Sequence, residues 1–164
     1  MTEKNKEGLQ GATFGVMEAT IMMLAVMMGL SATGNRFVVA IGLLTAGLAD
    51  AVANAAAFHV SEETETVHTR REIWKSTIYT FLATLVTVAV LIWPVLLMEI
   101  KQAVITSWVI GVIILLCIGY SVSRLTKRAK PIKLMAEYLA FGILAAALCY
   151  GLGVLVVHLT HGLA

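Results

Sequence analysis

Five long apolar segments most constrain what this chain can fold into. They occupy residues 11–32, 37–60, 74–98, 103–123 and 134–159. Each reaches the roughly 20 residues that a helix needs to cross the hydrocarbon core of a bilayer. A charged fraction of 13% and a mean hydropathy of +0.88 exclude a soluble globular protein of ordinary composition. The sequence therefore predicts an all-α integral membrane protein with five transmembrane helices, forming a single domain over residues 1–164.

The distribution of positive charge predicts the orientation of these helices. Ten of the 12 lysines and arginines fall on the amino-terminal tail and on the second and fourth loops. Cytoplasmic loops carry such an excess, so we expect the N-terminus in the cytoplasm and the C-terminus on the opposite side. The short tail holds Glu3 and Glu7, and no small-residue cleavage site follows the first apolar segment, so no cleaved signal peptide is expected. The expected location is the plasma (inner) membrane of a prokaryote.

Polar side chains inside the first two apolar segments are the main functional signal. Asp50 stands in the middle of the second segment, Asn54 follows four residues later, and Glu18 lies about one third of the way along the first. A carboxylate near the bilayer centre costs about 2.5–3.5 kcal/mol, so a packing role is an insufficient explanation for either acid. The two helices run antiparallel, and the rise per residue places Glu18 and Asp50 at similar depth. We therefore predict that these acids face one another across a shared site.

Other candidate residues leave alternatives open. Four positions in the second loop form either a cytoplasmic funnel for cations or an ordinary solvated loop: Glu62, Glu63, Glu65 and His68. Cys117 and Cys149 lie inside apolar segments without a CxxC spacing, so we interpret them as small apolar core residues. The sequence contains no phosphate-binding loop, nucleophile elbow, HExxH motif or cysteine-rich metal site. Neither an enzyme nor a permanently bound cofactor is expected, and a net charge of +2 does not indicate nucleic acid as a partner.

Two stretches resemble the vacuolar iron transporter family. GVMEATIMMLAVMMGL is similar to the first-helix pattern of that family, in which an acid followed by a small residue opens a run ending in glycine. GLADAVANAAAFHVSEETE is similar to its second-helix pattern. Pro94 and the later stretch FGILAAALCYGLG also fit, so the resemblance extends over essentially the whole chain.

The resemblance implies export of Fe²⁺ or Mn²⁺ from the cytoplasm, in exchange for protons, by a homodimer whose pore is lined by helices one and two. Glu18 matches the first-helix acid of the family and Asp50 matches the second-helix acid. Asn54 stands where the family has methionine, and Phe58 stands where it has an acid. The long cytoplasmic metal-binding insert between helices two and three is absent from this sequence.

These departures leave three interpretations of the site. The substrate differs, transport has been lost, or a metal site uses Glu18, Asp50 and Asn54 with a methionine such as Met22, four residues after Glu18. Oxygen ligands favour Mn²⁺ or Fe²⁺, whereas a thioether favours softer ions, and intramembrane acids also offer a route for protons. The alternative function is a non-transporting membrane scaffold that keeps the family fold. For the transporter, we expect a two-fold dimer interface that includes helix one, with Glu18 facing its symmetry mate.

Overall fold

The structure, a computed structural model, describes residues 6–65, 69–127 and 129–161. In this part of the chain the structure consists of five helices joined by short connections, with no strand. They are α1 (Lys6–Ser31), α2 (Arg36–Thr64), α3 (Arg70–Leu97), α4 (Ile100–Thr126) and α5 (Pro131–His161). All five are long and apolar enough to cross a membrane, which confirms the predicted all-α, five-helix fold.

Helix ends extend beyond the apolar segments because local side chains cap them. The connection between α1 and α2 uses Gly34 in a left-handed conformation (φ 65°), and Asn35 then caps α2. The side-chain oxygen of Asn35 accepts hydrogen bonds from the backbone N–H groups of Phe37 and Val38, at 2.9 and 3.4 Å. Such caps satisfy the backbone donors that have no partner within the helix. The helices therefore include polar end residues that hydropathy alone assigns to loops.

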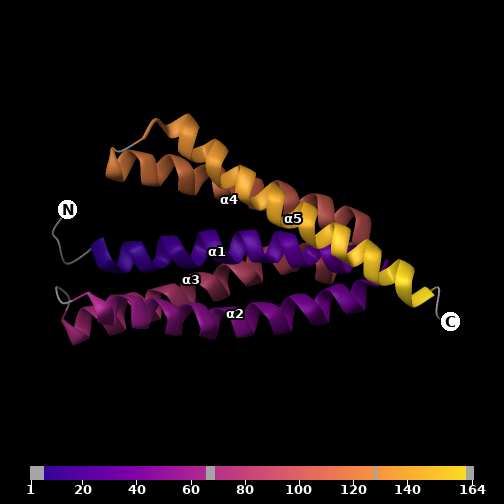
Figure 1. Cartoon of the computed structure of the whole chain (residues 1–164), viewed down its shortest axis with the longest axis horizontal. Coiled ribbons are helices and arrows are strands. Elements are labelled where there is room, and N and C mark those ends of the chain that lie inside the picture. Colours follow the sequence, from indigo (N-terminus) through magenta and orange to yellow (C-terminus); the bar gives the residue numbers. More distant parts are fainter. Residues whose placement is uncertain (1–5, 66–68, 128, 162–164) are drawn as a thin grey trace.

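Helix α1 is the centre of the bundle and packs against each of the other four helices. Helices α2 and α3 lie on one side of it, and α4 and α5 on the other (Figure 1). The start of α1 and the end of α5 are at opposite ends of the bundle, as an odd number of membrane crossings requires (Figure 1). A functional group on α1 can therefore be reached by side chains from several helices.

The contact between α1 and α3 is the tightest in the region of the predicted site. A Cβ atom added to Gly15 of α1 would lie 2.6 Å from the carbonyl oxygen of Thr80, so only glycine fits there. The Thr84 hydroxyl donates to the carbonyl oxygen of Gly15 at 3.4 Å. The face of α3 in this region is lined by buried small polar residues, namely Ser76, Thr77, Thr80, Thr84 and Thr87. Small residues of this kind allow helix backbones to approach closely within a membrane.

Helices α4 and α5 also pack against the rest of the bundle through small residues. Buried residues of α4 recur every fourth position, at Ala103, Ser107, Gly111, Leu115, Gly119 and Ser123. The Ser107 hydroxyl donates to the carbonyl oxygen of Leu91 on α3 at 2.9 Å. Gly153 of α5 lies directly against the backbone of Gly29 on α1. Large apolar side chains cover much of the outer surface, which fits a lipid environment.

Candidate metal centre

The structure brings together three of the four residues predicted as metal ligands. Asp50 and Asn54 are four residues apart and share one face of α2, and this face meets Glu18 of α1. The Asn54 amide nitrogen donates one hydrogen bond to the Glu18 carboxylate and another to Oδ2 of Asp50, the second at 3.0 Å. A single amide thus bridges two acids that belong to different helices. All three side chains are partly buried.

The Glu18 and Asp50 carboxyl groups lie close together, because the same Asn54 nitrogen donates to both of them. Two carboxylates at this separation repel each other unless a proton or a cation lies between them. The Asn54 amide uses its nitrogen for both acids, which leaves its carbonyl oxygen as an acceptor. The cluster therefore has the chemistry of a site for protons or for a cation that prefers oxygen ligands.

Met22, the fourth predicted ligand, packs against the apolar core cluster that includes Met23, Met27 and Leu43. Its role as a ligand stays a prediction. Among the residues that the structure describes, no group of three or more His, Cys, Asp or Glu side chains is arranged to hold a metal ion. One chain therefore supplies two carboxylates and one carboxamide at this position.

An aromatic pair lies next to the acids. The ring of Phe58 on α2 packs on the ring of Phe14 on α1, with 5.4 Å between the ring centroids and a tilt of 41°. Phe58 follows Asn54 by four residues, and Phe14 precedes Glu18 by four. The resemblance to the family singled out Phe58 as standing in place of an acid, but its partner Phe14 was not predicted. The four-residue spacing between Phe14 and Glu18 was the available signal.

The residues expected to form a cytoplasmic entrance differ in their surroundings. Glu62 is buried near the end of α2, four residues beyond Phe58, whereas Glu63 and Glu65 are exposed. His68 lies outside the described residues. The funnel interpretation stays a prediction, and Glu62 is the acid placed nearest the helix interface.

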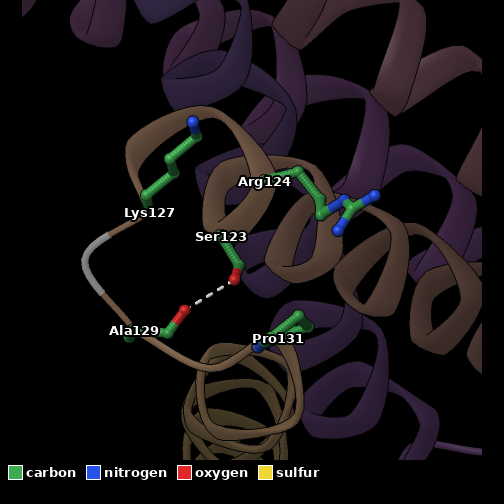
Figure 2. A pocket seen from close by; sticks show the side chains of 5 residues that line it. All are labelled: Ser123, Arg124, Lys127, Ala129 and Pro131. Atoms are coloured by element: carbon green, nitrogen blue, oxygen red, sulfur yellow. Dashed lines mark hydrogen bonds between the residues drawn. The ribbon is translucent and has the colours of Figure 1, made fainter.

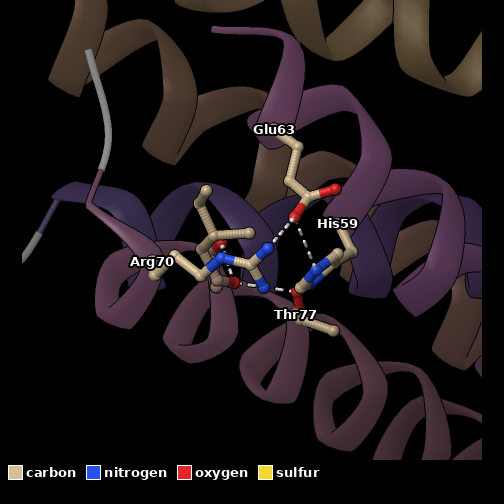
Figure 3. Close-up of polar contacts among 6 residues, drawn as sticks. His59, Glu63, Arg70 and Thr77 are labelled. Carbon is tan, nitrogen blue, oxygen red and sulfur yellow. Dashed lines mark hydrogen bonds and ion pairs between the residues drawn. The ribbon is translucent and has the colours of Figure 1, made fainter. Parts of the chain in front are cut away.

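A second polar cluster ties α2 to α3 on the other side of α2 (Figure 3). Nδ1 of His59 lies 2.8 Å from the Thr77 hydroxyl, and the imidazole packs edge-on against the Trp74 ring at 4.7 Å between centroids. Glu63 lies 3.6 Å from Nε2 of His59 and 3.7 Å from the Arg70 guanidinium. These contacts hold the two helices together and do not include the acids of the candidate site. The partners of His59, Thr77 and Trp74, both come from α3.

A hollow of about 530 Å³ lies where α4 ends and α5 begins. It is lined by Ser123, Arg124, Lys127, Ala129 and Pro131, and the Ser123 hydroxyl donates to the carbonyl oxygen of Ala129 at 2.7 Å. Figure 2 shows the Arg124 and Lys127 side chains leaving its wall in different directions. The lining offers no carboxylate, imidazole or thiolate, so it does not have the chemistry of a metal centre.

The sequence matches the VIT family over residues 53–154, which is more than half of the chain. The matched part includes Asn54, α3 and α4, while Glu18 and Asp50 precede it. No curated protein matches the chain. Membership of this family indicates metal-ion transport. With its five membrane-spanning helices, the chain is an integral membrane protein that belongs to the VIT (vacuolar iron transporter) family.

Proposed function

We propose that this protein moves Fe²⁺ or Mn²⁺ out of the cytoplasm, in exchange for protons, through the site formed by Glu18, Asp50 and Asn54. The observation that carries this proposal is the Asn54 amide, which bridges one carboxylate from α1 and one from α2. Membership of the VIT family supports the class of activity. Intramembrane acids that face another helix, and not lipid, are typical of ion pathways.

Binding of a cation requires a change at Asn54. Its N–H groups now contact both acids, and an N–H group cannot ligate a cation. Turning the amide over brings its carbonyl oxygen toward the acids in place of the nitrogen. The ion then meets two carboxylates and one carboxamide oxygen, a donor set that suits Mn²⁺ and Fe²⁺. Asn54 thus closes the empty site and helps to ligate the ion in the loaded one.

The closeness of the two carboxyl groups, which share one amide donor, supports exchange for protons. In the empty site a proton held by Glu18 or Asp50 relieves the repulsion between them. A divalent ion replaces that proton, because metal ligands must be deprotonated. Protons therefore move onto the site when the metal leaves it, and off it when the metal binds.

A homodimer would complete the ligand set. One chain supplies three ligands here, whereas a first-row divalent ion bound mainly by oxygen takes about six. A two-fold axis beside α1 would bring a second Glu18 and Asp50 to the same place, since a two-fold interface uses the same surface twice. The neighbouring face of α2 exposes Leu44, Leu48 and Val52, an apolar surface that either a second copy or lipid covers. We propose that Glu18 faces its symmetry mate in this dimer.

Metal flux into proteoliposomes, measured for Fe²⁺, Mn²⁺, Co²⁺ and Zn²⁺ under an imposed pH gradient, tests the proposal. We expect saturable flux of Fe²⁺ or Mn²⁺ that is abolished by Glu18→Gln and by Asp50→Asn. Glu137→Gln is the matched control, because Glu137 is an exposed acid on α5 that pairs with Lys133 at 3.8 Å. Unchanged flux in both site variants would refute the site. No flux of any of these metals in the unmodified protein would favour the scaffold alternative.

A further inference from the structure

We propose that Phe14 and Phe58 form a barrier between the acids and the end of the bundle at which α1 begins, and that Phe14 is the side chain that moves to open it. The purpose of such a barrier rests on the proposed function, but its existence can be tested without any transport.

The aromatic pair separates two acidic positions. Because α1 and α2 run antiparallel, Phe14 and Phe58 are both displaced from the acids in the same direction, by about 6 Å at the rise of an α-helix. Glu62 lies a further four residues along α2 and is buried. From that end of the bundle, the order is therefore Glu62, then the two rings in contact, then Asn54 with Glu18 and Asp50.

Rings in contact are a barrier to a hydrated ion. Their centroids are 5.4 Å apart, which is ring-to-ring contact and leaves no room for water between the rings. An apolar constriction of this kind stops ions because water cannot remain in it. An ion that approaches from the Glu62 end can therefore reach Asn54 and the acids only after one ring leaves the contact.

The helices themselves are held in place at this level. The backbone of α1 beside Phe14 is packed on α3 through Gly11 and Gly15, where an added Cβ atom would lie 2.5 and 2.6 Å from backbone oxygens. The start of α3 in turn holds α2 beside Phe58, through the contacts of His59 with Thr77 and Trp74. Opening by separation of α1 from α2 would have to break one of these attachments. A side-chain rotation needs neither.

The two rings are not equally free to rotate. Phe58 is 8% exposed and enclosed by its neighbours, whereas Phe14 is 40% exposed in the single chain, on the side of α1 that the proposed dimer places beside the two-fold axis. The side chain of an exposed residue changes quickly between staggered positions of its first torsion. Phe14 can therefore turn toward the space beside that axis and leave Phe58 in place, which assigns the moving part to α1 and the fixed part to α2.

The test measures access to the site with a thiol reagent in the full-length protein. Cys117 and Cys149 are replaced by Ser, and Asp50→Cys supplies a reporter behind the barrier. Trimethylammonium-ethyl methanethiosulfonate, which is positively charged and does not cross membranes, is added to vesicles of each orientation. We expect Phe14→Ala to raise the modification rate of the reporter thiol about tenfold when the reagent is added on the face at which α1 begins. Loss of one aromatic contact should increase the population of the open barrier by about that factor. Phe14→Trp should lower the rate, and the exposed Phe141→Ala on α5 should leave it unchanged.

Equal modification rates in Phe14→Ala, Phe14→Trp and the parent protein would overturn the proposal. A rise of the same size from both faces, or in Phe141→Ala, would also overturn it, since either result reports general loosening of the bundle. Phe58→Ala should raise the modification rate as Phe14→Ala does. If Phe58→Ala impairs folding because Phe58 is buried, the Phe14 variants alone provide the test. Access and metal flux are separate measurements. A protein that shows the barrier but transports nothing would refute the proposed function alone, and one that transports with no effect of Phe14 would refute the barrier alone.

Discussion

Helix α1 makes two very different contacts within a few residues of each other. Toward α3 it presents glycines, and the facing surface consists of threonine and serine side chains packed against backbone. Toward α2 it presents Phe14 and Glu18, which meet the Phe58 ring and the Asn54 amide. The first contact has no space for a larger side chain. The second consists of side-chain groups that can change partners.

This difference shows how a membrane protein of this size can combine a fixed framework with a changeable site. The contact of α1 with α3 holds backbone positions, because any added atom there meets a carbonyl oxygen. The contact of α1 with α2 depends on a bridging amide and on two rings, which can rotate without moving a helix. The acids lie at the contact that can rearrange, which is what binding and release of an ion require.

Disrupting the fixed contact should have the largest effect on stability. Gly15→Leu would force a side chain against the Thr80 carbonyl oxygen, and overpacking costs about 1–3 kcal/mol, with the upper end expected where the neighbour is backbone. The free energy of unfolding, measured by SDS titration in mixed micelles, should fall by that amount. Gly151→Leu on α5 is the matched control, because nothing lies within 4 Å of a Cβ atom added there. If Gly15→Leu and Gly151→Leu lowered the free energy of unfolding by similar amounts, the α1–α3 contact would not be a fixed contact that excludes larger side chains.

Removing the bridging amide should have an intermediate effect on stability and a strong effect on flux. Asn54→Ala deletes the donor shared by Glu18 and Asp50, and hydrogen bonds to charged groups contribute about 1.5–3 kcal/mol. We expect the free energy of unfolding to fall by an amount near the lower end of that range. Metal flux should fall by at least about tenfold. Thr45→Ala is the control on the same helix, because the Thr45 hydroxyl bonds only to carbonyl oxygens of α2. Full flux in Asn54→Ala would contradict a role for the amide in the site.

The tie between α2 and α3 should show the smallest effects. His59→Ala removes the contacts with Thr77 and Trp74 and should lower the free energy of unfolding by about 1 kcal/mol. Arg70→Ala removes only an exposed ion pair with Glu63 and should change it by less than about 0.5 kcal/mol. The same SDS titration compares the two variants. If Arg70→Ala lowered the free energy of unfolding more than His59→Ala, the exposed ion pair and not the partly buried imidazole would hold these helices together.

Parts of this arrangement could be read from the sequence because they depend on helix geometry alone. Apolar length predicts five membrane helices, and equal depth on antiparallel neighbours predicts that Glu18 meets Asp50. The spacing of four residues then adds Asn54 to the same face. These inferences need only the rise and the period of a helix, and the structure agrees with each of them.

Other parts depend on which helix lies beside which, and a hydropathy pattern does not contain that information. The partner of Phe58 is Phe14, and the partners of His59 come from the start of α3. The recurring Ser76, Thr80 and Thr84 were visible as a polar stripe in an apolar helix, but their target, the glycine face of α1, was not. Met22 was predicted as a ligand from its spacing to Glu18, yet spacing does not distinguish a side chain at the site from one packed on the adjoining core.

Equilibrium binding of Mn²⁺ tests the proposal that two copies of Glu18 and Asp50 share one divalent ion. The bound ion can be counted by electron paramagnetic resonance in purified protein, independently of transport. We expect about half an equivalent of bound Mn²⁺ per chain, because a site on a two-fold axis holds one ion for two chains. This binding should disappear in Asp50→Asn and in Glu18→Gln and persist in Glu137→Gln. One equivalent of Mn²⁺ per chain, or binding that is unchanged when both Glu18 and Asp50 are replaced, would refute the shared site.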